Sequence, residues 1–117
     1  MLVLGIIGAG GIFTGSNPAY TKSELFHHIK TSKASFLISE PEIFEGALAA
    51  ATEYGIPKSN IWIFDVISQS LPKGFVSWRQ LLGHGEKDWV RFDDQKTSVG
   101  TTAGRFFSSG TTGKPCC

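Results

Sequence analysis

Apolar residues occur along this chain in two patterns, short continuous runs and stripes at helical spacing, and the two patterns alternate. Residues 1–9 form an apolar run that predicts a buried helix, and residues 12–14 predict a short strand after it. Residues 15–18 have the order Gly-Ser-Asn-Pro, which is typical of a turn, because a proline pushes the preceding residue toward extended geometry. A new element is therefore expected only after Pro18.

The next element is predicted to be a helix that begins near Thr21. Thr21 and Glu24 have the spacing of a capping box, in which each side chain bonds to the backbone of the other residue. Leu25, Phe26 and Ile29 then form an apolar stripe at helical spacing, which predicts that this helix packs against a core.

A second helix is predicted by the same two signals. Ser39 and Glu42 have the spacing of another capping box, with a proline tolerated in the first turn. Gly55 and Pro57 are expected to end this helix. Its apolar positions, at helical spacing, are Ile43, Ala47, Leu48, Ala51 and Tyr54.

Short apolar runs of strand length flank this second helix at residues 35–38 and 61–64. A weaker capping box at residues 77–80 predicts a short helix that ends near Gly83, and the polar residues 84–102 are expected to form a long connection. Alternation of strands and helices predicts an α/β fold with a mainly parallel sheet, in which ligands bind where strands end.

Composition changes this picture little. The chain has 117 residues, about the length of one domain, and is 41% hydrophobic and 18% charged, as in ordinary globular proteins. Its net charge of +1 gives no indication of a nucleic-acid or membrane partner, and the apolar start is too short to span a bilayer. The only two cysteines, Cys116 and Cys117, are adjacent, so no disulfide framework is expected and a reducing compartment, the cytoplasm, is predicted.

Two pairs of neighbouring residues carry side chains of the kinds that bind metals. His27 and His28 are adjacent on a predicted helix, so they point in different directions, and both are expected to lie at the surface. Asp93 and Asp94 are expected to belong to a solvated loop end. No metal site is therefore predicted.

The glycines near the start of the chain suggest a dinucleotide-binding fingerprint. Gly8 and Gly10 match the first two glycines of G-x-G-x-x-G, a motif that follows a strand and opens a helix. Phe13 occupies the position of the third glycine, and Gly15 and Pro18 interrupt any helix that would follow. A dinucleotide-dependent oxidoreductase domain stays open as one hypothesis.

The most unusual stretch comes last, where a strand predicted over residues 102–107 leads into a loop rich in glycine and hydroxyl groups. Glycine lets successive backbone N–H groups turn toward one point, and together with hydroxyl donors they can cradle an anion such as phosphate. A Walker loop is excluded, because Pro115 stands where Ser or Thr must bind magnesium. The loop has the sequence Ser108-Ser109-Gly110-Thr111-Thr112-Gly113-Lys114-Pro115.

This loop resembles the phosphate-binding signature Ser/Thr-Ser-Gly-Ser/Thr-Thr-Gly-x-Pro-Lys of the adenylate-forming superfamily. The agreement ends at the next position, where Cys116 replaces the lysine. A second segment, from Gly10 to Thr21, resembles the pattern G-G-x-x-x-x-x-N-P-x-Y-T of 4-coumarate–CoA ligase-like and fungal acyl-CoA ligase-like enzymes. The two motifs stand in the order in which that family has them.

The resemblance implies that residues 1–117 are part of a large N-terminal adenylation domain and end inside its phosphate-binding loop. Intact members of the family react a small carboxylic acid with ATP and Mg²⁺ to give an acyl-adenylate, and most then transfer the acyl group to coenzyme A. Backbone and hydroxyl donors suit this chemistry, because they stabilise the charge that develops as pyrophosphate leaves. By resemblance, the ATP phosphates would be bound by Ser108, Ser109, Gly110, Thr111, Thr112, Gly113 and Lys114.

Later motifs of the family have no counterpart among these residues: the aromatic–Thr-Glu motif, the ribose-binding aspartate and the catalytic lysine. No catalytic residue is therefore assigned, and the chain alone is expected to be inactive. The intact enzyme is expected in the cytoplasm, with the peroxisome as the alternative. A small stand-alone nucleotide-binding or regulatory protein that uses the same loop is the remaining hypothesis.

Overall fold

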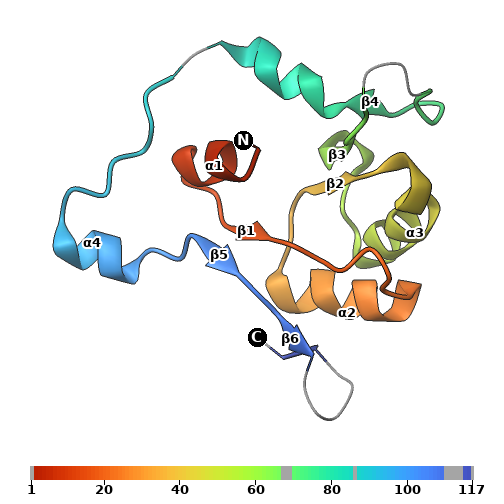
Figure 1. Cartoon of the computed structure of the whole chain (residues 1–117), viewed down its shortest axis with the longest axis horizontal. Coiled ribbons are helices and arrows are strands. Elements are labelled where there is room, and N and C mark those ends of the chain that lie inside the picture. Colours follow the sequence, from red (N-terminus) through yellow and green to blue (C-terminus); the bar gives the residue numbers. More distant parts are fainter. Residues whose placement is uncertain (1, 67–69, 86, 110–114, 117) are drawn as a thin grey trace. The chain divides into compact units, whose positions relative to one another are not determined.

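Short strands and helices alternate along the computed structural model of the chain (Figure 1). Two of its three small sheets are parallel, which confirms the α/β class and the mainly parallel pairing predicted from the sequence. The chain divides into two compact units, one of residues 16–85 and the other of residues 1–15 with 86–117. The structure describes residues 2–66, 70–85, 87–109 and 115–116.

The unit of residues 16–85 is built on a three-stranded parallel sheet in the order β2-β3-β4. In its register Leu37 pairs with Ile61, and Trp62 pairs with Val76. The elements of this unit, with η for a 3-10 helix, are α2 (Lys22–Ser32), β2 (Leu37–Ser39), η1 (Pro41–Ile43), α3 (Phe44–Tyr54), η2 (Lys58–Asn60), β3 (Ile61–Ile63), β4 (Val76–Ser77) and η3 (Trp78–His84).

The core of this unit forms between the sheet and the helices α2 and α3, which pack against each other. Ile61 and Ile63 alternate with Trp62 along β3, so both fall on the same face of the sheet, and they are 1% and 0% exposed. Removal of these side chains from water is the main stabilising contribution. The other hydrophobic members of the buried cluster are Ile29, Phe44, Ala50, Ala51 and Ile56.

The predicted capping box at the start of α2 is confirmed. The Thr21 N–H and hydroxyl both donate to Glu24 Oε2, at 2.8 and 2.7 Å, and the Glu24 N–H donates to Thr21 Oγ1 at 3.4 Å. The predicted end of α3 is also confirmed, because Gly55 takes the left-handed conformation, with φ of 98°, that suits glycine after a helix.

The capping box predicted at Ser39 and Glu42 does not form. Ser39 belongs to β2, where it pairs with Ile63, and its hydroxyl donates to the Glu40 carbonyl. The helix α3 begins only at Phe44, after η1. The strand expected at residues 35–38 is correspondingly displaced toward Ser39, so strand pairing here outweighs the local capping signal.

The other unit is made of shorter elements. β1 and β5 pair in parallel, and β6 and β7 pair antiparallel. A helix and a short strand form where they were predicted, but the helix is not buried as expected, since Leu4 is 51% exposed. Among the residues of this unit whose side chains are described, only Gly8 is buried. Its elements are α1 (Leu2–Gly8), β1 (Phe13–Thr14), α4 (Gln95–Gly100), β5 (Gly104–Arg105), β6 (Ser108–Ser109) and β7 (Pro115–Cys116).

Three predictions for the second half of the chain need correction. The short helix predicted after Ser77 forms with Ser77 as its N-cap, but it is a 3-10 helix, and the Ser77 hydroxyl accepts from the Arg79 N–H, one residue earlier than in a capping box. The connection predicted at residues 84–102 contains the helix α4. The last strand is shorter than residues 102–107, because only Gly104 and Arg105 pair with β1.

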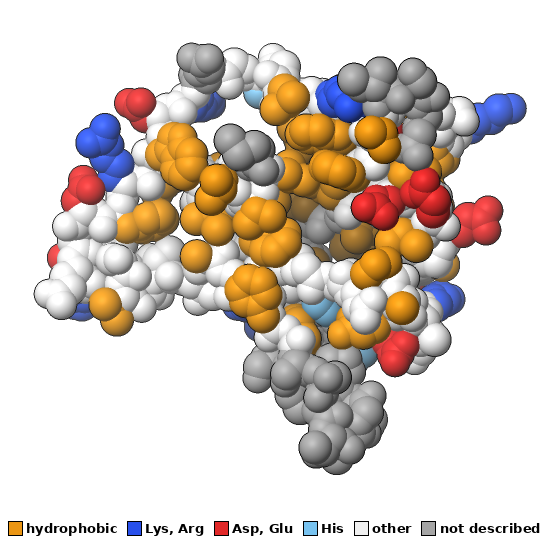
Figure 2. All heavy atoms as spheres, viewed as in Figure 1, with side chains coloured by type: hydrophobic (Ala, Val, Ile, Leu, Met, Phe, Trp, Pro, Cys, Tyr) orange, Lys and Arg blue, Asp and Glu red, His pale blue; other side chains and the backbone are white. Residues whose placement is uncertain are grey.

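Hydrophobic side chains reach the surface on the face that Figure 2 shows. The most exposed of the large ones include Phe36, Leu82, Val99 and Phe106, at 62%, 68%, 81% and 72%. None of the helices in the described part of the chain has the length and hydropathy needed to cross a membrane.

Candidate functional site

The strand β6 carries the first two residues of the predicted phosphate-binding loop. In the antiparallel pair with β7, Ser108 lies opposite Cys116 and Ser109 lies opposite Pro115. The remaining predicted site residues, Gly110, Thr111, Thr112, Gly113 and Lys114, lie outside the described residues. Cys116, which stands where the family pattern has lysine, is therefore placed beside the start of the loop by strand pairing.

A parallel strand pair links the two motifs that carry the family resemblance. β1 belongs to the first motif, and β5 comes just before the predicted phosphate-binding loop of the second. Phe13 pairs with Gly104 and Thr14 with Arg105, and the Phe13 N–H donates to the Ala103 carbonyl at 3.0 Å. Two segments that are far apart in sequence are therefore neighbours in the fold.

The glycines near the start of the chain serve packing. The element before them is the helix α1, whereas a dinucleotide-binding fingerprint needs a strand there. The Trp89 ring lies so close to Gly8 that a Cβ there would come within 2.7 Å of it, and the Val90 N–H donates to the Gly8 carbonyl at 2.8 Å. This geometry argues against the oxidoreductase hypothesis.

His28 is buried, which corrects the expectation that both histidines lie at the surface. Only 3% of His28 is exposed, whereas His27 is exposed. Burial lowers the pKa of His28, and the neighbouring His27 lowers it further. Leu25, His28, Ile29 and Ser32 have the i, i+3, i+4, i+7 spacing of a buried helix face, which is the sequence signal that could have revealed this burial.

Asp94 is the N-cap of α4. The Asp93–Asp94 pair therefore lies where a loop meets a helix, whereas only a loop end was expected. The Asp94 carboxylate accepts from the Thr97 N–H at 2.8 Å and from the Thr97 hydroxyl at 2.7 Å, and these bonds lower the pKa of Asp94. Within the part of the chain that the structure describes, no group of three or more His, Cys, Asp or Glu side chains could hold a metal ion.

A polar cluster that the sequence did not reveal lies at the carboxyl ends of β3 and β4. Asp65 follows β3 and accepts hydrogen bonds from the Ser77 hydroxyl and from Arg79 Nη1, the latter at 2.6 Å. The bond from Ser77 is the largest cause of the lowered pKa of Asp65. Asp65 and Arg79 form an ion pair with each other, and the Ser77 hydroxyl bonds to the same carboxylate. The cluster therefore connects the carboxyl ends of β3 and β4.

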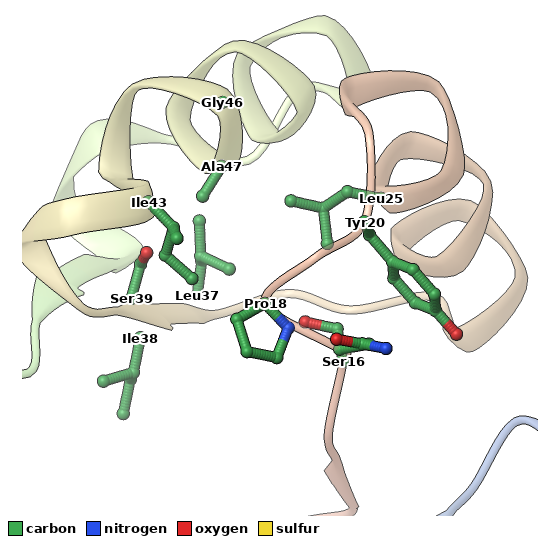
Figure 3. Close-up of a pocket in the computed structure, with 11 residues that line it drawn as sticks. Ser16, Pro18, Tyr20, Leu25, Leu37, Ile38, Ser39, Ile43, Gly46 and Ala47 are labelled. Atoms are coloured by element: carbon green, nitrogen blue, oxygen red, sulfur yellow. The ribbon is translucent and has the colours of Figure 1, made fainter.

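A small pocket of about 60 Å³ opens beside β2 in the unit of residues 16–85 (Figure 3). Ser16, Asn17 and Pro18 form one side of it, and Leu37 and Ser39 line it from β2. The Asn17 side chain accepts a hydrogen bond from the backbone two residues later, so the Asn-Pro part of the first motif builds a turn. None of the described residues that line this pocket is acidic or basic, so they offer no counter-charge to a phosphate.

Comparison with known proteins connects this geometry with a class of enzymes. Over 98% of its residues the chain is similar to fungal acyl-CoA ligases, which confirms the resemblance to adenylate-forming enzymes. It is 47% identical over 115 residues to acyl-CoA synthetase ACTT5 of Alternaria alternata. It is 47% identical over 117 residues to phenylacetyl-CoA ligase epaB and to acyl-CoA ligase azaF, both of Aspergillus niger. No family model matches the chain.

The chain spans only a small part of these relatives. It covers 20% of the Alternaria alternata protein and 22% of each Aspergillus niger protein. The chain is therefore similar to about one fifth of each of these fungal acyl-CoA ligases, in agreement with the motifs.

Proposed function

We propose that this chain is a segment of an ATP-dependent acyl-CoA ligase, and that its contribution to the reaction is the loop that binds the ATP phosphates. The observation that carries the proposal is the 47% identity to acyl-CoA ligases over 98% of the chain. The signature from Ser108 to Pro115 supports the assignment of the loop.

The chemistry of the loop residues fits a polyphosphate. Backbone N–H groups and hydroxyl donors act on a developing negative charge most strongly when they are positioned in advance. Ser109 pairs with Pro115 in the β6–β7 pair, so the described residues on either side of this stretch are neighbours. The proposed phosphate ligands are Ser108, Ser109, Gly110, Thr111, Thr112, Gly113 and Lys114.

The whole ligase would react a small carboxylic acid with ATP, releasing pyrophosphate, and pass the acyl group to coenzyme A. The names of phenylacetyl-CoA ligase epaB and of nicotinic acid-CoA ligase pyr1 of Aspergillus fumigatus, which is 26% identical, support a small carboxylic acid as substrate. Mg²⁺ would accompany ATP, but we assign no residue of this chain to it or to coenzyme A. A cytoplasmic location stays a prediction.

The proposal is tested in a chimera in which this chain replaces the matching segment of phenylacetyl-CoA ligase epaB. We expect phenylacetate-dependent exchange of pyrophosphate into ATP, because the relative supplies the remaining parts of the enzyme. Ser109→Ala should lower the exchange rate on the order of a hundredfold by removing one hydroxyl donor. Ser98→Ala, at an exposed position of α4, is the matched control and should leave the rate unchanged.

Two further variants make the outcome decisive. Cys116→Lys restores the residue of the family pattern, so it should raise the exchange rate of the chimera. The chain of 117 residues alone should show no exchange above a blank without protein. Exchange by the chain alone, or a chimera that stays inactive even with Cys116→Lys, would contradict the proposal.

A further inference from the structure

Phe106 lies over a glycine at the point where β5 leads into the phosphate-binding loop. If Gly104 carried a Cβ, that atom would come within 2.9 Å of Phe106 Cε2 and 3.3 Å of Phe106 Cζ. The Phe106 ring also faces the Phe13 ring of β1, with centroids 6.4 Å apart and planes tilted by 59°. Both contacts arise within the unit that carries β1, β5 and β6.

This ring is not held by a core, because Phe106 is 72% exposed. Gly104 leaves room for the ring at this place, and the ring of Phe13 is its contact partner. The pair β1–β5 itself is short, with only two paired positions. The ring contact is therefore a further contact between β1 and the segment that follows β5.

The strand β1 is in turn fixed to α1. The Gly11 N–H donates to the Ile6 carbonyl at 2.8 Å, just before β1 begins. A continuous set of contacts thus runs from α1 through β1 to β5, and Ser108 of β6 follows only two residues after Phe106. Phe106 thus lies between the β1–β5 pair and the start of the proposed loop.

We propose that Gly104, Phe106 and Phe13 are positioning residues for the phosphate-binding loop. They touch no substrate; the ring of Phe106, seated on Gly104 and against Phe13, sets where β6 delivers Ser108 and Ser109. The effect on ATP binding rests on the proposed function. The effect of the Phe106 ring on the position of β6, which is the structural part of the inference, does not depend on that function.

The structural part is tested in the full chain by amide hydrogen exchange and backbone chemical shifts. Gly104→Ala displaces the Phe106 ring, so the Phe13 N–H should exchange about threefold to tenfold faster and the amide signals of Ser108 and Ser109 should shift. Gly100→Ala is the matched control, because a Cβ there meets nothing within 4 Å. It should change none of these signals.

A double variant separates ring displacement from other effects of the added methyl group. In a Phe106→Ala background the ring is absent, so adding Gly104→Ala should change the Phe13 exchange rate less than about twofold. An equally large effect of Gly104→Ala with and without the ring, or no effect of Gly104→Ala in the unchanged chain, would overturn the proposal.

The functional part is tested in the chimera with epaB. Gly104→Ala should raise KM for ATP about threefold to tenfold and leave KM for phenylacetate within about twofold, a split that general loss of folding does not produce. Phe106→Tyr, which keeps the ring, should retain most of the apparent affinity for ATP. Equal changes in both KM values, or equal behaviour of Gly104→Ala and Gly100→Ala, would sink the inference. A chimera without any exchange would count against the proposed function, while amide exchange in the chain would still decide the positioning role.

Discussion

The two units of this chain are each stabilised internally by different interactions. In the unit of residues 16–85, Ile61 and Ile63 are buried together with side chains of α2 and α3. In the other unit, only Gly8 is buried among the residues whose side chains are described, and its strands have two residues each. One unit has a core, and the other depends on single backbone hydrogen bonds and ring contacts.

This difference matters because the proposed phosphate-binding loop belongs to the second unit, in which only Gly8 is buried among the residues with described side chains. Stability is not uniform across a protein, and segments with few buried contacts open at a lower free-energy cost. A loop in such a unit depends strongly on individual contacts, such as Phe106 on Gly104. The comparison predicts that equivalent substitutions have large effects in the first unit and small, local ones in the second.

The largest effect is expected from Ile63→Ala, which removes a fully buried side chain from β3. Loss of burial and the cavity left behind should lower the free energy of unfolding by about 2–5 kcal/mol. If the alanine variant does not fold, Ile63→Val is measured in its place and should lower the free energy of unfolding by about 0.5–1.5 kcal/mol. Urea unfolding followed by circular dichroism gives the measurement.

The control for Ile63 is Val99→Ala in α4, where the side chain is 81% exposed. Its effect on the free energy of unfolding should stay within about 0.5 kcal/mol. Similar losses from both substitutions would mean that the two units do not differ as described.

A middle-sized effect is expected at the capping box of α2. Thr21→Ala should cost about 1 kcal/mol at neutral pH, because Thr21 Oγ1 no longer accepts from the Glu24 N–H. Ser23→Ala, in the same first turn, is the matched control and should cost far less. Chemical unfolding at pH 7 measures both.

The cost of Thr21→Ala should also depend on pH. Hydrogen bonds from the Thr21 backbone and side chain lower the pKa of Glu24 from its ordinary value of 4.5. A lowered pKa of an acid contributes stability above the pKa of the unfolded chain, and this contribution is lost as pH falls through the folded pKa. The difference between wild type and Thr21→Ala should therefore shrink below about pH 4.5. A constant difference from pH 7 to pH 3 would contradict this account.

The sequence predicted the fold best where local signals and burial agreed. Thr21 with Glu24 formed the expected capping box, and Gly55 ended α3 as expected. Ser39 carried the same local signal and failed, because its backbone pairs with Ile63 of β3 and pairing partners cannot be read from local spacing. His28 was misplaced although its helical spacing with Ile29 was available in the sequence.

The candidate site was predictable only as a motif. The signature from Ser108 to Pro115 is contiguous, so the resemblance to acyl-CoA ligases could be found without a structure. The contact of Phe106 with Gly104 and Phe13 requires that β1 and β5 pair in register, which no local pattern shows. The polar cluster of Asp65 with Arg79 likewise depends on the adjacency of β3 and β4.

The smallest effect is expected from Asp94→Ala, which removes the cap of α4 in the unit without a core. Capping chemistry is the same as at Thr21, since the Asp94 carboxylate accepts from the Thr97 N–H at 2.8 Å. We expect faster amide exchange at Thr97 but no measurable shift of the urea midpoint, because opening α4 exposes no buried side chain. Asp93→Ala is the matched control and should change neither quantity. If Asp94→Ala moved the urea midpoint as far as Thr21→Ala does, the two units would have to unfold in a single cooperative step. The proposed phosphate-binding loop would then have the same free energy of unfolding as the core of the first unit.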